Sequence, residues 1–150
     1  MSQSLSTARA EIKTKMESVS GMGIVNDYRR NAHTWDEIAD GFKSDDRING
    51  WIIEMTSAPA DWGQMTNELI RTYNFRIWGL YSVKDDDASG KVFEDLTDEV
   101  LNELTKDRTL NQKAHRVMPA QLVNIDDNLF SGVLCHRCEI LLTVELRLSL

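Results

Sequence analysis

The sequence predicts an α+β fold in which a single, mainly antiparallel sheet of about four strands is packed by helices. Apolar residues recur every three or four positions in segments 4–19 and 91–105, which is the spacing of one helix face. Apolar and polar residues alternate in segments 48–57, 71–83 and 132–148, as in half-buried strands, and "AQLVNIDD" at 120–127 reads as a further strand. Strands that are adjacent in sequence usually pair as antiparallel neighbours, so we expect one sheet with helices on a face.

The first third of the chain predicts a helix, a short strand and a second helix. Ser4 or Ser6 can cap the first helix, and the glycines of "SGMG" end it. The short run "IVNDY" follows and reads as a strand. In "HTWDEIADGF", residues 33–42, Thr34 and Glu37 have the spacing of a capping box, which predicts the second helix.

Residues 58–69, between the first two long strands, predict a protruding interface segment. The segment is too long for a tight hairpin loop, so we expect a mobile loop or a helical turn that starts near Pro59. Trp62 and Met65 lie in it, and Trp78 lies on the more polar face of the following strand. Because tryptophan and methionine are enriched at protein interfaces, Trp62, Pro59, Met65 and Trp78 are candidate interface residues. The alternative is that these side chains fold back and cover a small core.

The last strand, "GVLCHRCEILLTVELRL" at 132–148, carries both cysteines of the chain. Its even positions are almost wholly apolar and its odd positions mostly charged, so successive side chains face opposite sides of the sheet. Cys135 and Cys138 therefore point to opposite faces, and only His136 shares a face with Cys138. A structural zinc site needs four ligands, so we predict free thiols, no metal and no cofactor. A small metal- or ligand-binding module built on this strand is the alternative from another class of protein.

No other pattern predicts an enzyme. The chain has no P-loop, no Rossmann glycine pattern and no G-x-S-x-G elbow. The acidic pair Asp45-Asp46 and the acidic triplet Asp85-Asp86-Asp87 lack the ligand spacing of a calcium loop. We therefore expect no catalytic residues.

The charge balance argues against a protein that grips nucleic acid. Twenty-four acidic residues face 17 basic ones among 150, for a formal net charge of −7. The N-terminal segment has no apolar h-region, and no run approaches the about 20 apolar residues needed to cross a bilayer. We expect one domain over residues 1–150, working in a reducing cytoplasm without a membrane.

The whole chain resembles the tail-terminator or tail-completion proteins of long-tailed bacteriophages. Four stretches carry the likeness in order: "ARAEIKTKMESVSGMGIVNDYRR", "DDRINGWIIEMTSAP", "YNFRIWGLYSVKDDDASGKVFEDLTDEVLNEL" and "FSGVLCHRCEILLTVEL". The likeness lies in the order of the predicted elements and in these short stretches of sequence, and none of the stretches carries catalytic residues. Neck and head-completion proteins have a similar size, so a head–tail connector role is the nearest alternative.

The resemblance implies a structural protein of the virion that is assembled in the host cytoplasm. It implies a homo-oligomeric ring, most often of six subunits, that closes the head-proximal end of the tail tube and meets the tube protein and the head–tail connector proteins. DNA would pass through the ring without sequence-specific binding. Because an acidic wall repels phosphate, we expect Asp45, Asp46, Asp85, Asp86 and Asp87 to face the central opening.

Overall fold

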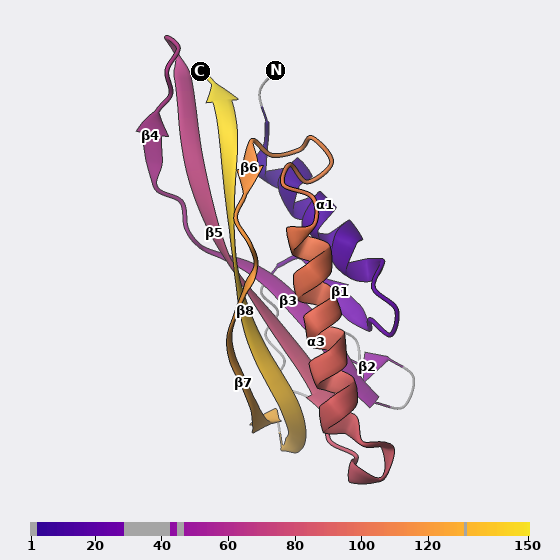
Figure 1. Cartoon of the computed structure of the whole chain (residues 1–150). Helices are drawn as coiled ribbons and strands as arrows, with labels where there is room; N and C mark the ends of the chain where they lie inside the picture. The colour runs from indigo at the N-terminus through magenta and orange to yellow at the C-terminus, as the bar shows by residue number, and fades with distance from the viewer. Residues whose placement is uncertain (1–2, 29–42, 45–46, 131) are drawn as a thin grey trace.

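The computed structural model describes residues 3–28, 43–44, 47–130 and 132–150 (Figure 1). The predicted helix at 33–42, with Trp35, and the predicted lumen residues Asp45 and Asp46 lie outside these ranges. The elements in chain order are α1 (Leu5–Glu17), β1 (Ile24–Asn26), β2 (Lys43–Ser44), β3 (Arg47–Ser57), β4 (Ala60–Trp62), β5 (Glu68–Ser82), the 3₁₀ turn η1 (Asp85–Asp87), α3 (Ser89–Thr105), β6 (Arg116–Val117), β7 (Gln121–Phe130) and β8 (Val133–Ser149).

The α+β class is confirmed, but the expected sheet of about four antiparallel strands is wrong in strand number and in direction. Seven strands form one mixed sheet, and the two-residue β2 pairs with the start of β3 as an eighth. The order across the sheet is β1-β3-β5-β8-β6, with β4 beside β5 and β7 beside β8. β1 runs parallel to β3, whereas every other pair is antiparallel.

The parallel strand β1 is held by buried side-chain amides. Asn26 donates to the carbonyl of Trp51 at 3.1 Å, and Asn49 donates to the carbonyl of Gly21 at 2.9 Å. The indole N–H of Trp51 donates to Asn49 Oδ1 at 3.2 Å. The two contacts made by the amides of Asn26 and Asn49 join positions 25 and 28 residues apart in the chain, so the alternation of neighbouring residues does not predict them.

Residues 58–69 form neither the mobile loop nor the helical turn that the sequence suggested. β4 pairs with β5 from Ala60↔Arg71 to Trp62↔Leu69. β3 pairs with the same edge of β5, at residues 74–81. β3 and β4 are thus two parts of one interrupted strand, and a bulge near Ser57 separates them. The connecting turn is only residues 63–67, a common length for a hairpin.

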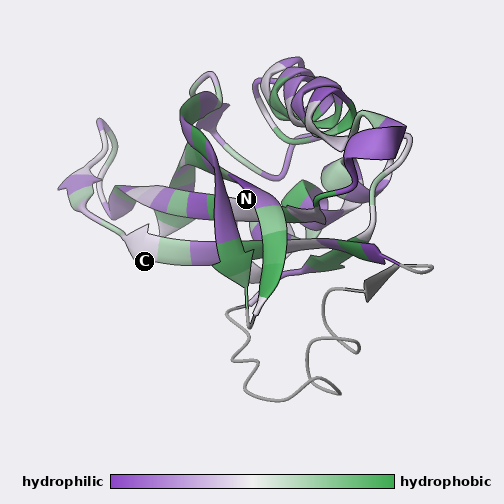
Figure 2. Cartoon of the chain, turned by 90° about the horizontal axis from the view of Figure 1, so that it is seen from below, coloured by the Kyte–Doolittle hydropathy of each residue, from purple (hydrophilic) through white to green (hydrophobic). Residues whose placement is uncertain are grey.

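Both described helices lie on one face of the sheet (Figure 1), as two layers (Figure 2). The predicted helices at 4–19 and 91–105 are confirmed, and the Ser4 side chain caps α1 by accepting from the backbone N–H of Thr7. The main core lies between the layers, where Ile12 of α1 and Phe93 of α3 meet Trp51, Phe75 and Ile140 of the sheet. A second, smaller cluster on the other face joins Ile48, Leu80 and Cys135. The sheet is therefore covered unevenly, with most of its apolar side chains under the helices.

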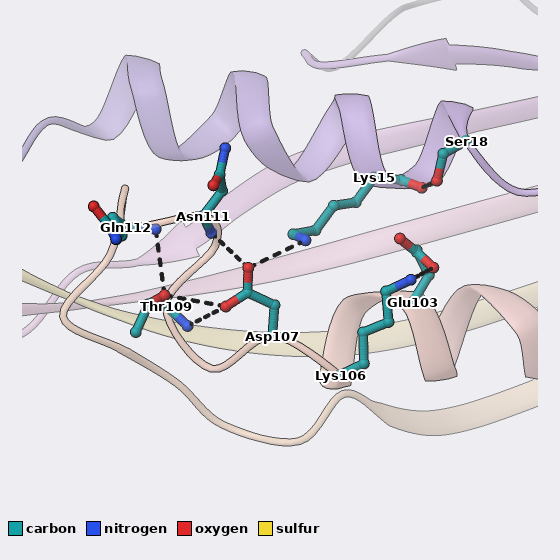
Figure 3. A network of polar contacts seen from close by, with 8 residues as sticks. All are labelled: Lys15, Ser18, Glu103, Lys106, Asp107, Thr109, Asn111 and Gln112. Carbon is teal, nitrogen blue, oxygen red and sulfur yellow. Dashed lines mark hydrogen bonds and ion pairs between the residues drawn. The ribbon is translucent and has the colours of Figure 1, made fainter.

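A turn after α3 ties the two helices together (Figure 3). The Asp107 carboxylate accepts from the backbone N–H groups of Thr109 and Asn111 at 3.0 and 2.7 Å and pairs with Lys15 of α1 at 3.5 Å. These bonds lower the pKa of Asp107 from 3.8 to about 2. The carboxylate holds a turn in which three successive residues, 110–112, have positive φ, a conformation that non-glycine residues rarely adopt.

Candidate functional site

The β4–β5 hairpin presents the most exposed large apolar side chains of the described residues. Trp62 is 74% exposed and Met65 is 73% exposed. The turn is fixed by the N–H of Gly63 donating to the carbonyl of Glu68 at 2.8 Å. A groove of about 540 Å³ runs beside it, lined by both side chains together with Ile70, His115 and Arg147. The interface candidates Trp62 and Met65 therefore share one projecting surface.

The other two interface candidates have different surroundings. Pro59 is exposed at the junction of β3 and β4, where its carbonyl accepts from the N–H of Thr72 at 2.8 Å. Trp78 is half-buried on the sheet face opposite the helices, and its indole N–H donates to Glu54 at 3.0 Å. The guanidinium groups of Arg76 and Arg137 lie 5.6 and 5.5 Å from its ring centroid, so Trp78 anchors a charged cluster within the subunit.

A second exposed apolar surface, which sequence reasoning missed, follows strand β7. Eight of its ten residues are exposed, and four of them are large and apolar: Leu122, Val123, Ile125 and Leu129. β7 pairs with β8 along one side only, and no other strand of the described residues pairs with it. The sequence predicted a strand at 120–127, and β7 extends three residues farther, to Phe130. Its exposure depends on its position at the edge of the sheet, which the sequence pattern does not give.

The acidic turn η1 precedes α3. Asp85, Asp86 and Asp87 are all exposed, and Lys84 pairs with Asp87 at 3.3 Å. The turn ends at Ala88, whose φ of 53° is left-handed, so the chain reverses sharply into the helix. All three carboxylates thus lie at the surface beside the start of α3, and that of Asp87 is also ion-paired.

The two cysteines lie on opposite faces of the sheet, as alternation predicted. Cys138 belongs to the main core under the helices, and Cys135 belongs to the small cluster on the other face. Burial raises the pKa of Cys135 to about 11 and that of Cys138 to about 12, so both thiols stay protonated near neutral pH. Within the described residues, no group of three or more His, Cys, Asp or Glu side chains is placed to hold a metal ion.

His136 belongs instead to a serine–histidine–aspartate cluster that sequence reasoning also missed. The Ser89 hydroxyl lies 2.8 Å from His136 Nε2, and Asp127 Oδ1 lies 2.6 Å from His136 Nδ1. When the ring proton is on Nδ1 it is donated to Asp127, and Nε2 then accepts from the Ser89 hydroxyl. The distances are those of a hydrolytic triad. The residues come from α3, β8 and β7, so no local motif could have revealed them.

The accessibility of Ser89 argues for a structural role of this cluster. Ser89 is only 1% exposed, and its oxygen also accepts from the backbone N–H of Lys84 at 2.8 Å. The neighbouring hollow is about 170 Å³, and Ser89 does not line it. An attacking hydroxyl must reach a substrate carbonyl, and this one is enclosed. The cluster therefore fastens the start of α3 to β7 and β8.

Comparisons with known proteins do not assign the chain to a family. No protein-family model matches it, and no curated protein matches it in sequence. No helix in the described part of the chain is long and apolar enough to cross a membrane.

Proposed function

We propose that this protein is a structural subunit of a bacteriophage tail that closes the head-proximal end of the tail tube as a homo-oligomeric ring, most simply of six copies. The sequence likeness to tail-terminator proteins suggests the role. The ring would stop further addition of tube subunits and offer a docking surface to the connector proteins of the head.

The observation that carries the proposal is the pair of separate exposed apolar surfaces on one small subunit. Trp62 and Met65 project from the β4–β5 hairpin, and the apolar residues of β7 lie at the opposite lateral edge of the sheet, beyond β8. A closed ring needs two different, complementary patches, because subunits related by rotation meet head to tail. A monomer with one ligand site would need neither surface, and large exposed apolar patches commonly mark association sites.

The charge of the subunit suits passage of DNA through the ring. The net charge is −7, and Asp85–Asp87 stand exposed in a turn beyond the sheet. We propose that these carboxylates face the opening, where they repel phosphate and prevent DNA from binding to the wall. Contacts between such small subunits can be weak in solution and become strong at the tube end, where each subunit gains a second contact.

The test combines purified tail tubes with this protein. We expect electron microscopy to show a ring at one end of each tube and no further growth when free tube protein is added. A phage that lacks the protein should make overlong or headless tails beside normal heads. Tails of normal length beside unjoined heads would favour a head–tail connector role instead, and tails that join heads normally would exclude both.

A mass measurement with elemental analysis for zinc separates the assembly role from a metal-binding module. We expect rings, or monomers that assemble on tubes, without stoichiometric zinc. A stable monomer that carries one zinc ion and ignores tail tubes would favour the metal-binding module.

A further inference from the structure

Strand β7 is a long edge strand that lacks several of the features that normally prevent edges from pairing, although its register with β8 shifts between Leu122 and Asn124. Natural edge strands are often protected by lysine, by proline or by being very short. β7 has ten residues, "QLVNIDDNLF", with no lysine, arginine or proline. Its two carboxylates are already paired: Asp126 with Arg137 at 2.9 Å and Asp127 with His136 at 2.6 Å. The strand therefore presents apolar side chains, carboxylates that already have partners within the subunit, and a backbone edge that can accept another strand.

The opposite side of the sheet carries a second free edge at the β4–β5 hairpin. β4 pairs with β5 and with no other described strand. Its three residues, Ala60, Asp61 and Trp62, are all exposed. One chain thus has two different strand edges, and each of them is next to exposed apolar side chains.

The directions of these two edges are complementary. β8 is antiparallel to both β5 and β7, and β4 is antiparallel to β5. β4 therefore runs in the direction of β8, and β7 runs in the opposite direction. A second copy placed beside the first in the same orientation brings its β4 next to β7 as an antiparallel neighbour, which is the commoner kind of pairing.

We propose that β7 of one subunit adds as a strand to the β4 edge of the next copy, so that one sheet continues from subunit to subunit around the ring. This inference rests on the proposed ring function and names its contact. Trp62 and Met65 of one copy would then cover apolar residues at the β7 edge of the other. Main-chain hydrogen bonds supply affinity in such strand addition, and the side chains supply specificity.

The relative height of the two edges sets the inclination of the strands. Positions along the sheet can be compared through the paired residues of β8. Gln121 of β7 pairs with Leu141 of β8. Ala60 of β4 pairs with Arg71 of β5, which in turn pairs with Leu146 of β8. These two levels on β8, Leu141 and Leu146, are five residues of strand apart. β4 and β7 run away from each other from these points, so pairing of all three residues of β4 with β7 needs an offset of at least seven residues, about 23 Å at about 3.3 Å per residue. A continuous sheet with this offset closes only if its strands are inclined to the ring axis, as the strands of barrels are.

A second copy paired through its β4 is favoured over β7 pairing with itself. Twofold antiparallel pairing of β7 would bring Asp126 and Asp127 of both copies together near the middle of the strand, so four carboxylates would lie close to one another. Like charges on neighbouring strands are destabilising. β4 brings only one carboxylate, that of Asp61.

Thiol cross-linking distinguishes these arrangements. Gln121→Cys and Asp61→Cys are prepared as separate proteins, mixed at tail-tube ends and treated with a short bismaleimide; the native thiols are buried. We expect a cross-linked dimer only in the mixture. A dimer from Gln121→Cys alone, or from Asp61→Cys alone, would show self-pairing of one edge and overturn the proposal. No dimer in any sample would overturn it too, and if rings still cap the tubes the proposed function survives.

A charge placed on the edge gives an independent test with a matched control. Val123→Lys with Leu129→Lys adds the protection that β7 lacks, at side chains 53% and 67% exposed. We expect the melting temperature to stay close to that of the wild type. The yield of the cross-link between Gln121→Cys and Asp61→Cys should fall about tenfold, which corresponds to a loss of about 1.4 kcal/mol of association free energy. Val92→Lys on α3, at a side chain 43% exposed, is the control and should leave the yield unchanged. An unchanged yield in the β7 variant would overturn the proposal.

Discussion

Replacing Gly79 by alanine tests the packing of the central row of the sheet. Gly79 of β5 lies between Trp51 of β3 and Cys138 of β8, and the Trp51 ring in turn packs against Phe93 of α3. A Cβ atom at Gly79 would lie 2.5 Å from Trp51 Cζ3 and 2.8 Å from Cys138 Sγ. Carbon atoms in contact normally lie about 3.5–4.0 Å apart, so the buried neighbours would have to move by about 1 Å.

The size of the effect follows from two opposing contributions. Overpacking of a core costs about 1–3 kcal/mol, and alanine recovers about 0.5–1 kcal/mol because it restricts the unfolded chain more than glycine does. The difference spans about 0 to 2.5 kcal/mol, and because three contacts would be shorter than 3.0 Å we expect Gly79→Ala to lower the free energy of unfolding by about 1–2.5 kcal/mol, in the upper part of that range. Cys138→Ala removes one of the two obstacles, so the double variant should lose less than the sum of the two single losses.

Urea unfolding followed by tryptophan fluorescence measures this effect, and Gly90→Ala is its control. A Cβ at Gly90 would lie 3.6 Å from His136 Cε1, an ordinary contact, and the residue is in helix α3. The control should be neutral or up to about 1 kcal/mol more stable. The reasoning is refuted if Gly79→Ala unfolds at the same urea concentration as the wild type or at a higher one with an unchanged slope.

Four further predictions concern the cysteines, the buried cluster, the turn after α3 and the acidic turn. Cys135→Ser with Cys138→Ser should leave ring formation intact while Cys138→Ser costs about 1–3 kcal/mol of stability in urea; loss of assembly with loss of bound zinc would contradict this. Ser89→Ala should cost about 1–3 kcal/mol because His136 loses a buried partner, and a fluorophosphonate probe should not label the wild type; specific labelling of Ser89 would show a reactive serine. The pKa of Asp107 is lowered to about 2, so its contribution to stability is complete above about pH 4 and is lost as pH falls toward 2; Asp107→Asn should remove that part of the acid dependence of unfolding, and an identical acid profile would count against it. Replacing each residue of Asp85–Asp87 by lysine should make assembled rings retain DNA in a filter-binding assay where wild-type rings do not, and equal retention would argue that the turn lies away from the opening.

The sequence by itself determined the local elements where burial follows a simple period. The stripes of α1 and α3 and the alternation of β8 place each side chain toward or away from one layer, because the periods of 3.6 and 2 are properties of the backbone. The opposite orientation of Cys135 and Cys138 follows from the same period and needs no tertiary information. The sequence also narrowed the cap of α1 to Ser4 or Ser6, because a cap acts within a few residues, and the structure has Ser4.

Only the tertiary structure decided which strands pair, in which direction, and which edges stay open. The parallel pairing of β1 depends on contacts between residues far apart in the chain, and the exposure of β7 depends on its position at the edge of the sheet. The pairing of β4 with β5 is local, but the sequence pattern of residues 58–69 did not reveal it. The meeting of Ser89 with His136 and Asp127 also depends on contacts between distant parts of the chain. The spacing of apolar residues in the sequence indicates which side of a helix or strand is apolar, but it does not indicate which other element covers that side. The apolar residues of β7 look like core residues in the sequence, and they are exposed because the sheet ends beside them.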